Sequence, residues 1–354
     1  MAEIVTDPAH MTPGWLTEVL GGPFDGVTVS DFEATPVGTG QMGDSVRLVL
    51  THDGGDDTPT SVVAKLPAAD EKSRQTAAAL RSYEIEVNFY RHLASTVDMR
   101  TPACFHADFD PATSAFVLML EDMAPAEQGD QLEGTTPERA GVAVEELPKL
   151  HAPRWGDPGL GELDWFARST PEMATFTVML ISGLWDGFQP RFDGRIRPEI
   201  MGVATDLMAN LNSYLTLRDG PMTVSHGDYR LDNLLFATES GGDPVTVVDW
   251  QTTTQGYGVA DLSYFVGAGL VPEDRRTHER DLVDRYRDGM AARGVRLDSN
   301  DLWEDFRRFS FAGLMMAIAA SMLVEETERG DEMFITMAER HGQHALDLNA
   351  IALL

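Results

Sequence analysis

The stretch His226-Gly-Asp-Tyr-Arg-Leu-Asp-Asn233, with Val247-Val-Asp-Trp250 shortly after it, decides how this sequence is interpreted. Phosphoryl transfer needs a carboxylate near the attacking hydroxyl, metal ligands at the phosphates and positive charge on the transferred group. Asp228 and Asn233 stand five positions apart, so one loop can divide these tasks. Asp228 would face the acceptor hydroxyl, and Asn233 would bind Mg²⁺, which prefers hard oxygen ligands.

Asp249 is a second candidate metal ligand. It ends a predicted strand that forms a hairpin with the apolar residues 234–236, so it should return to the side of the first loop. An isolated His-x-Asp would more often be a core histidine beside a solvated acid. The ordered set of Asp228, Asn233 and Asp249 instead favours a chemical role.

Three glycines, Gly38, Gly40 and Gly43, precede a predicted strand at residues 46–50. A dinucleotide-binding fold requires a strand, then the glycines, then a helix. Here a strand follows the glycines, which favours a loop that folds over phosphates and offers them backbone N–H groups. Ser45 could add a hydroxyl, and a plain hairpin turn is the alternative.

The pattern His226-x-Asp228-x-x-x-x-Asn233, followed by Asp249, resembles the catalytic loop and metal-binding aspartate of kinases. Its His-Gly-Asp form is similar to the aminoglycoside phosphotransferase and choline kinase families, nearest to their ecdysteroid-kinase-like branch. The resemblance implies ATP and Mg²⁺ as cofactors. It spans about residues 37–265 and includes Gly40-Gln-Met-Gly-Asp44, Glu86-Val-Asn-Phe-Tyr90, Leu120-Glu-Asp122, Leu150-His-Ala152 and Asp261-Leu-Ser-Tyr-Phe265.

Lys65 lies in Val-Val-Ala-Lys on a predicted strand, which resembles the kinase strand whose lysine reaches the α- and β-phosphates. Its partner should be a glutamate on the next helix, which the apolar spacing predicts over residues 71–95. Glu86, 21 residues after Lys65, is the favoured partner, and Glu84 is an alternative on another helix face.

The resemblance implies an α+β, bilobal protein-kinase-like fold. Residues 1–122 would form a small nucleotide-binding lobe, an antiparallel β-sheet with one helix. Residues 123–354 would form a larger, mainly helical lobe with the catalytic loop and the acceptor site. The hinge between them would be residues 120–123, where Glu121 and Met123 would bind the adenine through their backbone.

Two departures from protein kinases point to a small-molecule acceptor. Gly227 replaces the arginine that commonly pairs with an activation-loop phosphate, and the short segment from Asp249 to Asp261 leaves no room for a peptide platform. The resemblance also implies that His226 is mainly structural, that Asp228 is the catalytic base, and that Asp261 braces the loop.

Other functions fit less well. A pseudokinase that binds nucleotide without transfer usually lacks the lysine, the base or a metal ligand, yet Lys65, Asp228, Asn233 and Asp249 are all present. An NAD-dependent oxidoreductase is disfavoured by the strand that follows the glycines.

The acceptor pocket should lie in the helical lobe. Its candidate walls are the aromatic and acidic residues Trp165, Phe166, Trp185, Asp186, Phe188, Trp303, Glu304 and Asp305. Acids and aromatic faces suit a cationic acceptor such as an aminoglycoside or a quaternary ammonium. Core packing is the alternative for each residue, and a sugar-like or steroid-like acceptor stays open.

The composition limits the classes of partner that the protein is expected to bind. A net charge of −30 disfavours binding to nucleic acid or to anionic membranes, which need basic clusters. The acidity suits solubility, tolerance of salt or cationic partners. The single cysteine, Cys104, fits the reducing cytoplasm. The sequence does not determine the oligomeric state or the choice between ATP and GTP.

Overall fold

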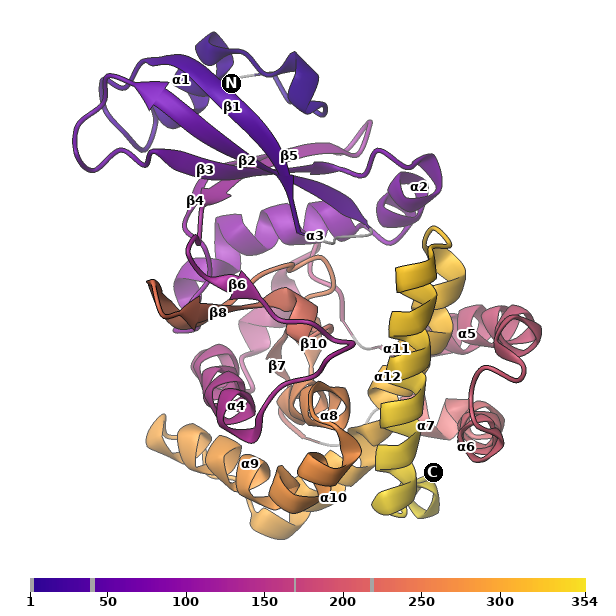
Figure 1. Ribbon diagram of the computed structural model, residues 1–354. Helices are drawn as coiled ribbons and strands as arrows, with labels where there is room; N and C mark the ends of the chain where they lie inside the picture. The colour runs from indigo at the N-terminus through magenta and orange to yellow at the C-terminus, as the bar shows by residue number, and fades with distance from the viewer. Residues whose placement is uncertain (1–2, 39–41, 169, 217–219) are drawn as a thin grey trace.

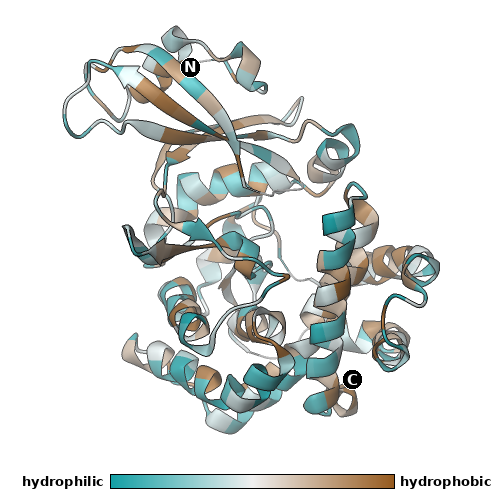
Figure 2. Ribbon diagram, in the orientation of Figure 1, coloured by the Kyte–Doolittle hydropathy of each residue, from teal (hydrophilic) through white to brown (hydrophobic). Residues whose placement is uncertain are grey.

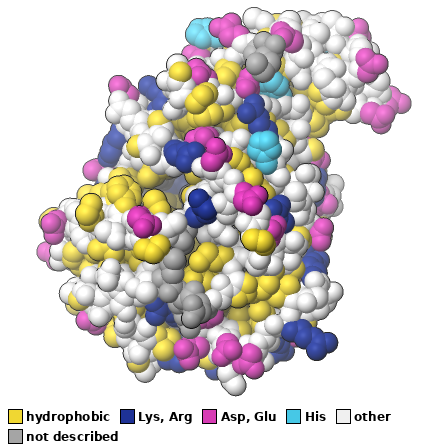
Figure 3. Space-filling model, turned by 180° about the vertical axis from the view of Figure 1, so that it is seen from behind, with side chains coloured by type: hydrophobic (Ala, Val, Ile, Leu, Met, Phe, Trp, Pro, Cys, Tyr) yellow, Lys and Arg dark blue, Asp and Glu magenta, His cyan; other side chains and the backbone are white. Residues whose placement is uncertain are grey.

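The computed structural model describes residues 3–38, 42–168, 170–216 and 220–354. The chain forms a strand-rich lobe and a larger helical lobe, and it passes from the first to the second after strand β5 (Figure 1). On the face seen in Figure 3, acidic side chains lie scattered among basic and apolar ones.

The small lobe is built on a five-stranded antiparallel sheet in the order β1-β2-β3-β5-β4. Ser45 pairs with Lys65 across β2 and β3, so the end of the glycine-rich connection lies beside the lysine. The strands are β1 (Val29–Val37), β2 (Gly43–His52), β3 (Ser61–Pro67), β4 (Cys104–Asp110) and β5 (Ala115–Glu121).

The small lobe contains more helix than the sequence predicts. Helix α1 (Pro13–Leu20) packs its apolar side against one face of the sheet, and α3 (Ser82–Asn88) lies on the other side (Figure 1). The helix expected over residues 71–95 is broken: α2 (Glu71–Ala79) ends before Arg81, whose φ of 58° is left-handed. A π-helical turn over Phe89–Leu93 follows α3.

The large lobe packs its helices around two hydrophobic clusters. Figure 2 shows mixed teal and brown on its outer helices, the pattern of helices that bury only one face. The helices are α4 (Pro137–His151), α5 (Pro171–Phe192), α6 (Pro198–Ala209), α7 (Leu211–Leu215), α8 (Gly258–Gly269), α9 (Pro272–Ala292), α10 (Ser299–Arg308), α11 (Ala312–Leu323) and α12 (Glu328–Asp347).

Two small antiparallel sheets position the loops of the large lobe. One pairs β7 (Thr223–Ser225) with β10 (Thr254–Gly256), and the other has the order β6-β8-β9. The stretch 226–233 therefore connects strands of two different sheets, and Asp249 follows β9. The second sheet consists of β6 (Glu127–Gln128), β8 (Leu234–Thr238) and β9 (Gly241–Val247).

One helical stretch among the described residues, Ser299–Leu323, is long and apolar enough to cross a membrane by length and composition alone. In the structure it is divided into α10, a short 3₁₀ turn and α11. Because α11 packs against α5 and α12 in the helical lobe, the stretch is only weak evidence for a membrane span.

A second connection joins the lobes, far from the hinge. Helix α2 of the small lobe lies above the end of α11 (Figure 1). Lys72 Nζ donates to the carbonyl of Val324 at 2.9 Å, and Thr76 Oγ1 donates to that of Leu323 at 3.1 Å. These donors satisfy carbonyls that have no partner within their own helix.

Candidate active site

The loop over residues 226–233 is braced from below by one carboxylate. Asp261, in the first turn of α8, accepts the backbone N–H of His226 at 2.7 Å and that of Gly227 at 2.9 Å. His151 Nε2 also lies 3.2 Å from Asp261. Burial would raise the pKa of Asp261, but the hydrogen bond and charge of His151 outweigh it and hold the pKa below its usual range. The geometry matches the bracing role expected for Asp261.

Gly227 is required by the shape of this loop. Its φ is +82°, and a Cβ there would lie 2.5 Å from the carbonyl oxygen of Thr252. The ring of His226 is fully buried, with Nε2 3.1 Å from the carbonyl of Val248 and Nδ1 3.3 Å from the N–H of Asp228. His226 thus joins the loop to the segment that carries Asp249, which supports a structural role.

The carboxylate of Asp228 has three side-chain partners. Oδ1 accepts the hydroxyl of Tyr264 at 2.5 Å, and Oδ2 accepts Arg230 Nε at 3.0 Å and Asn233 Nδ2 at 3.0 Å. Arg230 also pairs with Asp232. The acid proposed as the base is therefore held in one orientation.

The two candidate metal ligands, Asn233 and Asp249, line the same cavity, and each has a side-chain oxygen for which the described residues supply no hydrogen-bond donor. Asn233 turns its amide nitrogen toward Asp228, donating to the Asp228 carbonyl at 2.8 Å, so its amide oxygen points away from that residue. Asp249 has a left-handed φ of 66° and contacts Lys65 through Oδ1 only. No three His, Cys, Asp or Glu side chains converge on a metal site within the described ranges. One carboxylate and one amide suit Mg²⁺, which keeps several waters and binds substrate phosphates.

Lys65 lies between two carboxylates. Its Nζ is 2.7 Å from Glu86 Oε1 and 3.0 Å from Asp249 Oδ1. Burial opposes both charges, yet the attraction of Lys65 keeps the pKa of Asp249 below its usual value, and the two acids raise the pKa of Lys65. Burial raises the pKa of Glu86. Glu84, the alternative partner, pairs instead with Arg81 at 2.8 Å.

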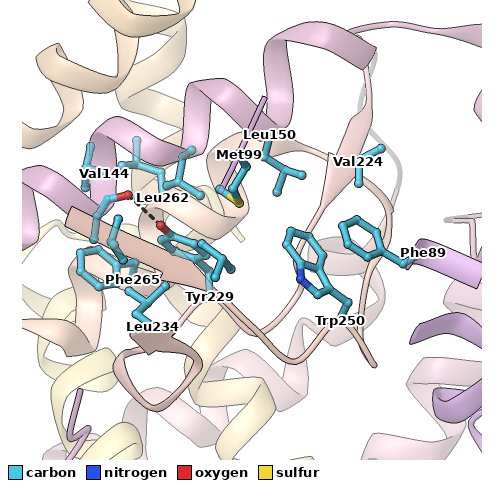
Figure 4. Packing of buried hydrophobic residues seen from close by; sticks show 14 of the residues in the cluster. Phe89, Met99, Val144, Leu150, Val224, Tyr229, Leu234, Trp250, Leu262 and Phe265 are labelled. Atoms are coloured by element: carbon cyan, nitrogen blue, oxygen red, sulfur yellow. Dashed lines mark hydrogen bonds between the residues drawn. The ribbon is translucent and has the colours of Figure 1, made fainter. Parts of the chain in front are cut away.

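Trp250 anchors the segment that carries Asp249. Its indole stacks on Phe89 with ring centres 3.8 Å apart (Figure 4). The backbone N–H of Trp250 donates to Glu86 Oε1 at 3.2 Å. The π-helical turn supplies Phe89 directly after α3. Glu86, Lys65 and Asp249 are therefore held by one packed unit that connects the two lobes.

A cavity of about 380 Å³ lies between the lobes, within the range of small-molecule sites. It brings together the residues expected at the nucleotide and the metal: Gly38, Gly43, Ser45, Lys65, Glu86, Glu121, Met123, Asn233 and Asp249. Gly40 lies outside the described residues. Asp228 is not in the cavity wall but contacts two residues that are, Arg230 and Asn233.

Two arginines clamp the predicted hinge. Arg47 forms a two-pronged pair with Asp122 at 2.7 and 2.9 Å, and Arg100 lies 2.8 Å from Glu121. The Glu121 carboxylate is occupied by Arg100 and by the backbone N–H of Ala103, so its expected contact to a base is through the backbone. The Met123 carbonyl already accepts the N–H of Ala126 at 2.9 Å.

The residues expected to line the acceptor pocket do not converge on Asp228. Trp165, Phe166 and Phe188 are buried in hydrophobic clusters. The guanidinium of Arg280 stacks on Trp303 at 3.2 Å. Glu304 and Asp305 line a second cavity of about 410 Å³ that shares no wall residue with the first. For the three buried aromatics, core packing was the correct alternative.

The sequence analysis did not predict two residues of the site, Arg230 and Tyr264. Arg230 stands two positions after Asp228 and lines the cavity between the lobes. Tyr264 lies in the phrase that begins at Asp261, three positions on, which is one turn of a helix. That spacing was the available signal, because two residues so placed share a helix face.

A model of the phosphotransferase enzyme family matches residues 33–297, most of the chain. The chain belongs to this family. The family is the one that the motif at residues 226–233 indicates. The assignment of this phosphotransferase to the ecdysteroid-kinase-like branch stays an expectation. A search of curated proteins finds no significant match.

Solved structures of kinases share the fold of this phosphotransferase. Choline kinase from Cryptosporidium parvum superposes with a TM-score of 0.55 at 10% identity, over 90% of this chain and 89% of that one. An aminoglycoside phosphotransferase, APH(2″)-IIIa, solved with GDP and kanamycin, gives 0.53 at 13% identity over 95% and 98%. A thermostable mutant of APH(4)-Ia, solved with ADP and hygromycin B, gives 0.51 at 12% identity over 96% and 98%. The bilobal kinase-like α+β fold is confirmed.

Proposed function

We propose that this small-molecule phosphotransferase transfers the γ-phosphoryl group of ATP to a hydroxyl group. Residues 1–122 bind the nucleotide, and residues 123–354 supply the base and the acceptor site. The observation that carries the proposal is the single cavity shared by Lys65, Asn233 and Asp249, with Asp228 directly behind it. The single cysteine and the acidic surface fit a protein of the cytoplasm.

On the nucleotide side, each residue has a distinct task. The glycine-rich connection covers the phosphates, with Gly38, Gly40, Gly43 and Ser45 as donors, and the hinge at Glu121 and Met123 meets the base. Lys65, fixed by Glu86, contacts the phosphates. Because its ammonium is held at 2.7 Å by a buried carboxylate, it needs little reorganisation when phosphate arrives.

Asn233 and Asp249 would hold Mg²⁺, and their available oxygens fit that ion. When bound, Mg²⁺ neutralises charge on the phosphates. Lys65 must then exchange part of its contact with Asp249 for contact with phosphate.

In the transfer, Asp228 accepts the proton of the acceptor hydroxyl. The acceptor oxygen forms a bond to the γ-phosphorus, and the bond from that phosphorus to the bridging oxygen breaks. Its electron pair leaves on ADP. The acceptor is a small hydroxylated molecule, of the aminoglycoside, choline, sugar or steroid kind. A pseudokinase is not supported, because the lysine, the base and both metal ligands are in place.

The test compares Asp228→Asn with the parent protein. We expect turnover of Mg·ATP with a panel of hydroxylated amines, sugars and sterols to fall by about 100-fold or more in the variant. Affinity for Mg·ATP should change little, because Asp228 lies outside the nucleotide cavity. Equal loss of binding and turnover would overturn this division of roles, and unchanged turnover would remove Asp228 as the base.

A further inference from the structure

The two carboxylate oxygens of Asp228 differ in the number of hydrogen bonds that they accept. Oδ2 accepts from both Arg230 and Asn233, each at 3.0 Å, whereas among the residues that the structure describes only Tyr264 donates to Oδ1, at 2.5 Å. Each carboxylate oxygen offers about two lone-pair positions. Oδ2 is therefore filled, and the position left for a further donor is on Oδ1, beside the tyrosine hydroxyl.

Helix α8 holds the catalytic loop at two levels. Asp261 accepts the backbone N–H groups of His226 and Gly227, and Tyr264, one turn later, donates to the side chain of Asp228. Residues three apart lie on the same face of a helix. The backbone of the loop and the side chain of its acid are thus set by one rigid element.

Tyr264 has little freedom of its own. It is 4% exposed, and its ring lies 5.2 Å from the fully buried ring of His341 on α12. Burial raises its pKa well above the usual value, and the negative charge of Asp228 adds to the effect. The phenol consequently keeps its proton and acts as the donor to Asp228.

Tyrosine hydroxyls elsewhere in this lobe have other partners. Tyr229 donates to the carbonyl of Ala143 at 2.7 Å, and Tyr286 lies 3.0 Å from His151 (Tyr229 in Figure 4). Both of those contacts stabilise the core behind the loop. The contact of Tyr264 differs because it ends on the acid that would take the acceptor's proton.

We infer that Tyr264 is a positioning residue for the transfer: its hydroxyl fixes Oδ1 of Asp228, so that the remaining lone pair of this oxygen faces the acceptor hydroxyl. The inference rests on the proposed function of Asp228 as the base. The acceptor proton passes to Oδ1, while Oδ2 stays bound to Arg230 and Asn233. Tyr264 neither gains nor loses a proton in this step.

The experiment uses Tyr264→Phe, which removes only the hydroxyl. Tyr214→Phe is the matched control, because Tyr214 is also nearly buried in the large lobe and its ring packs 5.8 Å from Phe311. The first probe is Mg·ATP with water as the acceptor, followed by the same panel of hydroxylated compounds. We expect Tyr264→Phe to lower kcat by about 10- to 100-fold with an unchanged KM for ATP, and Tyr214→Phe to stay within about twofold.

A crystal structure of Tyr264→Phe with a non-hydrolysable ATP analogue gives a second readout that needs no turnover. We expect the Asp228 carboxylate to be rotated or to occupy two orientations. An unchanged carboxylate, or an unchanged kcat in a protein whose Asp228→Asn variant is inactive, would overturn the role of Tyr264 alone. If Asp228→Asn keeps full activity, the proposed base itself fails.

Discussion

The two sides of Asp228 are built differently. On the nucleotide side, the lysine, the hinge and the metal candidates already line a cavity of about 380 Å³. On the acceptor side, Asp228 is held from behind by Tyr264, and the aromatic residues expected to form a wall lie in the core. Membership of the phosphotransferase family does not define the acceptor, so the acceptor side cannot be inferred from it.

The largest effect should come from Lys65→Met on the nucleotide side. The variant loses the charge proposed to contact the phosphates, so we expect kcat/KM to fall by at least about 100-fold. It also leaves Glu86 buried without its cation, which should lower the free energy of unfolding by about 3–5 kcal/mol.

Turnover of Mg·ATP and urea denaturation measure these two losses. Arg285→Met is the control, because Arg285 pairs with Asp281 on α9 and their side chains are 46% and 61% exposed. Such a pair should contribute under about 1 kcal/mol. If Lys65→Met kept most of its activity, the contrast between the two sides would lose its main support.

On the acceptor side, the buried His341 beside Tyr264 should make the free energy of unfolding depend on pH. Burial lowers the pKa of His341 to about 3, with Arg340 and Arg275 adding to the effect, and His344 and the ring of Tyr264 lie beside it. A histidine whose pKa is lowered by folding contributes stability above its unfolded pKa, and this stability is lost as the pH falls. From pH 7 to 5, His341 should account for a loss of about 2 kcal/mol.

Urea denaturation of His341→Gln at pH 7, 6 and 5 tests this contribution. The unfolding free energy of the variant should fall less steeply with decreasing pH than that of the parent. His10→Gln, at an exposed position near the N-terminus, controls for a histidine substitution as such. Equal slopes for His341→Gln and the parent would show that the packing behind Tyr264 does not exclude a proton.

The smallest effect should come from the hinge. Arg47→Ala removes the two-pronged pair with Asp122, which is partly exposed, so we expect about 1 kcal/mol and a rise of about fivefold in the KM for ATP. Arg91→Ala is matched to it, since both arginine side chains are 37% exposed and Arg91 pairs with Asp108 on β4. A larger effect from Arg91→Ala would mean that the hinge does not depend on this clamp.

Much of the nucleotide side could be predicted because its residues lie in short phrases at fixed spacing. Lys65 stands on an apolar strand, Glu86 follows 21 positions later in a helical phrase, and Asp228 and Asn233 share a loop. The clamp between Arg47 and Asp122 could not be predicted, because it joins residues 75 positions apart with no local pattern.

The fold was harder to predict where burial does not alternate. Strand β4 is half-buried at every position, so it has no two-residue periodicity. Helix α8 is buried on nearly every side and has no amphipathic pattern, although its residues Asp261 and Tyr264 hold the loop over residues 226–233. The break at Arg81 was invisible because a left-handed arginine has no sequence signature.

The contact between α2 and α11 limits how the two lobes can separate. With the hinge on one side and Lys72 and Thr76 on the other, the two lobes are tied at both edges of the cleft. Parting them at the second edge exposes the last carbonyls of α11 and withdraws a cation from the negative end of that helix. If the lobes separate at this edge to admit the proposed nucleotide, that motion is coupled to fraying of a helix that lies in the opposite lobe from the glycine-rich loop.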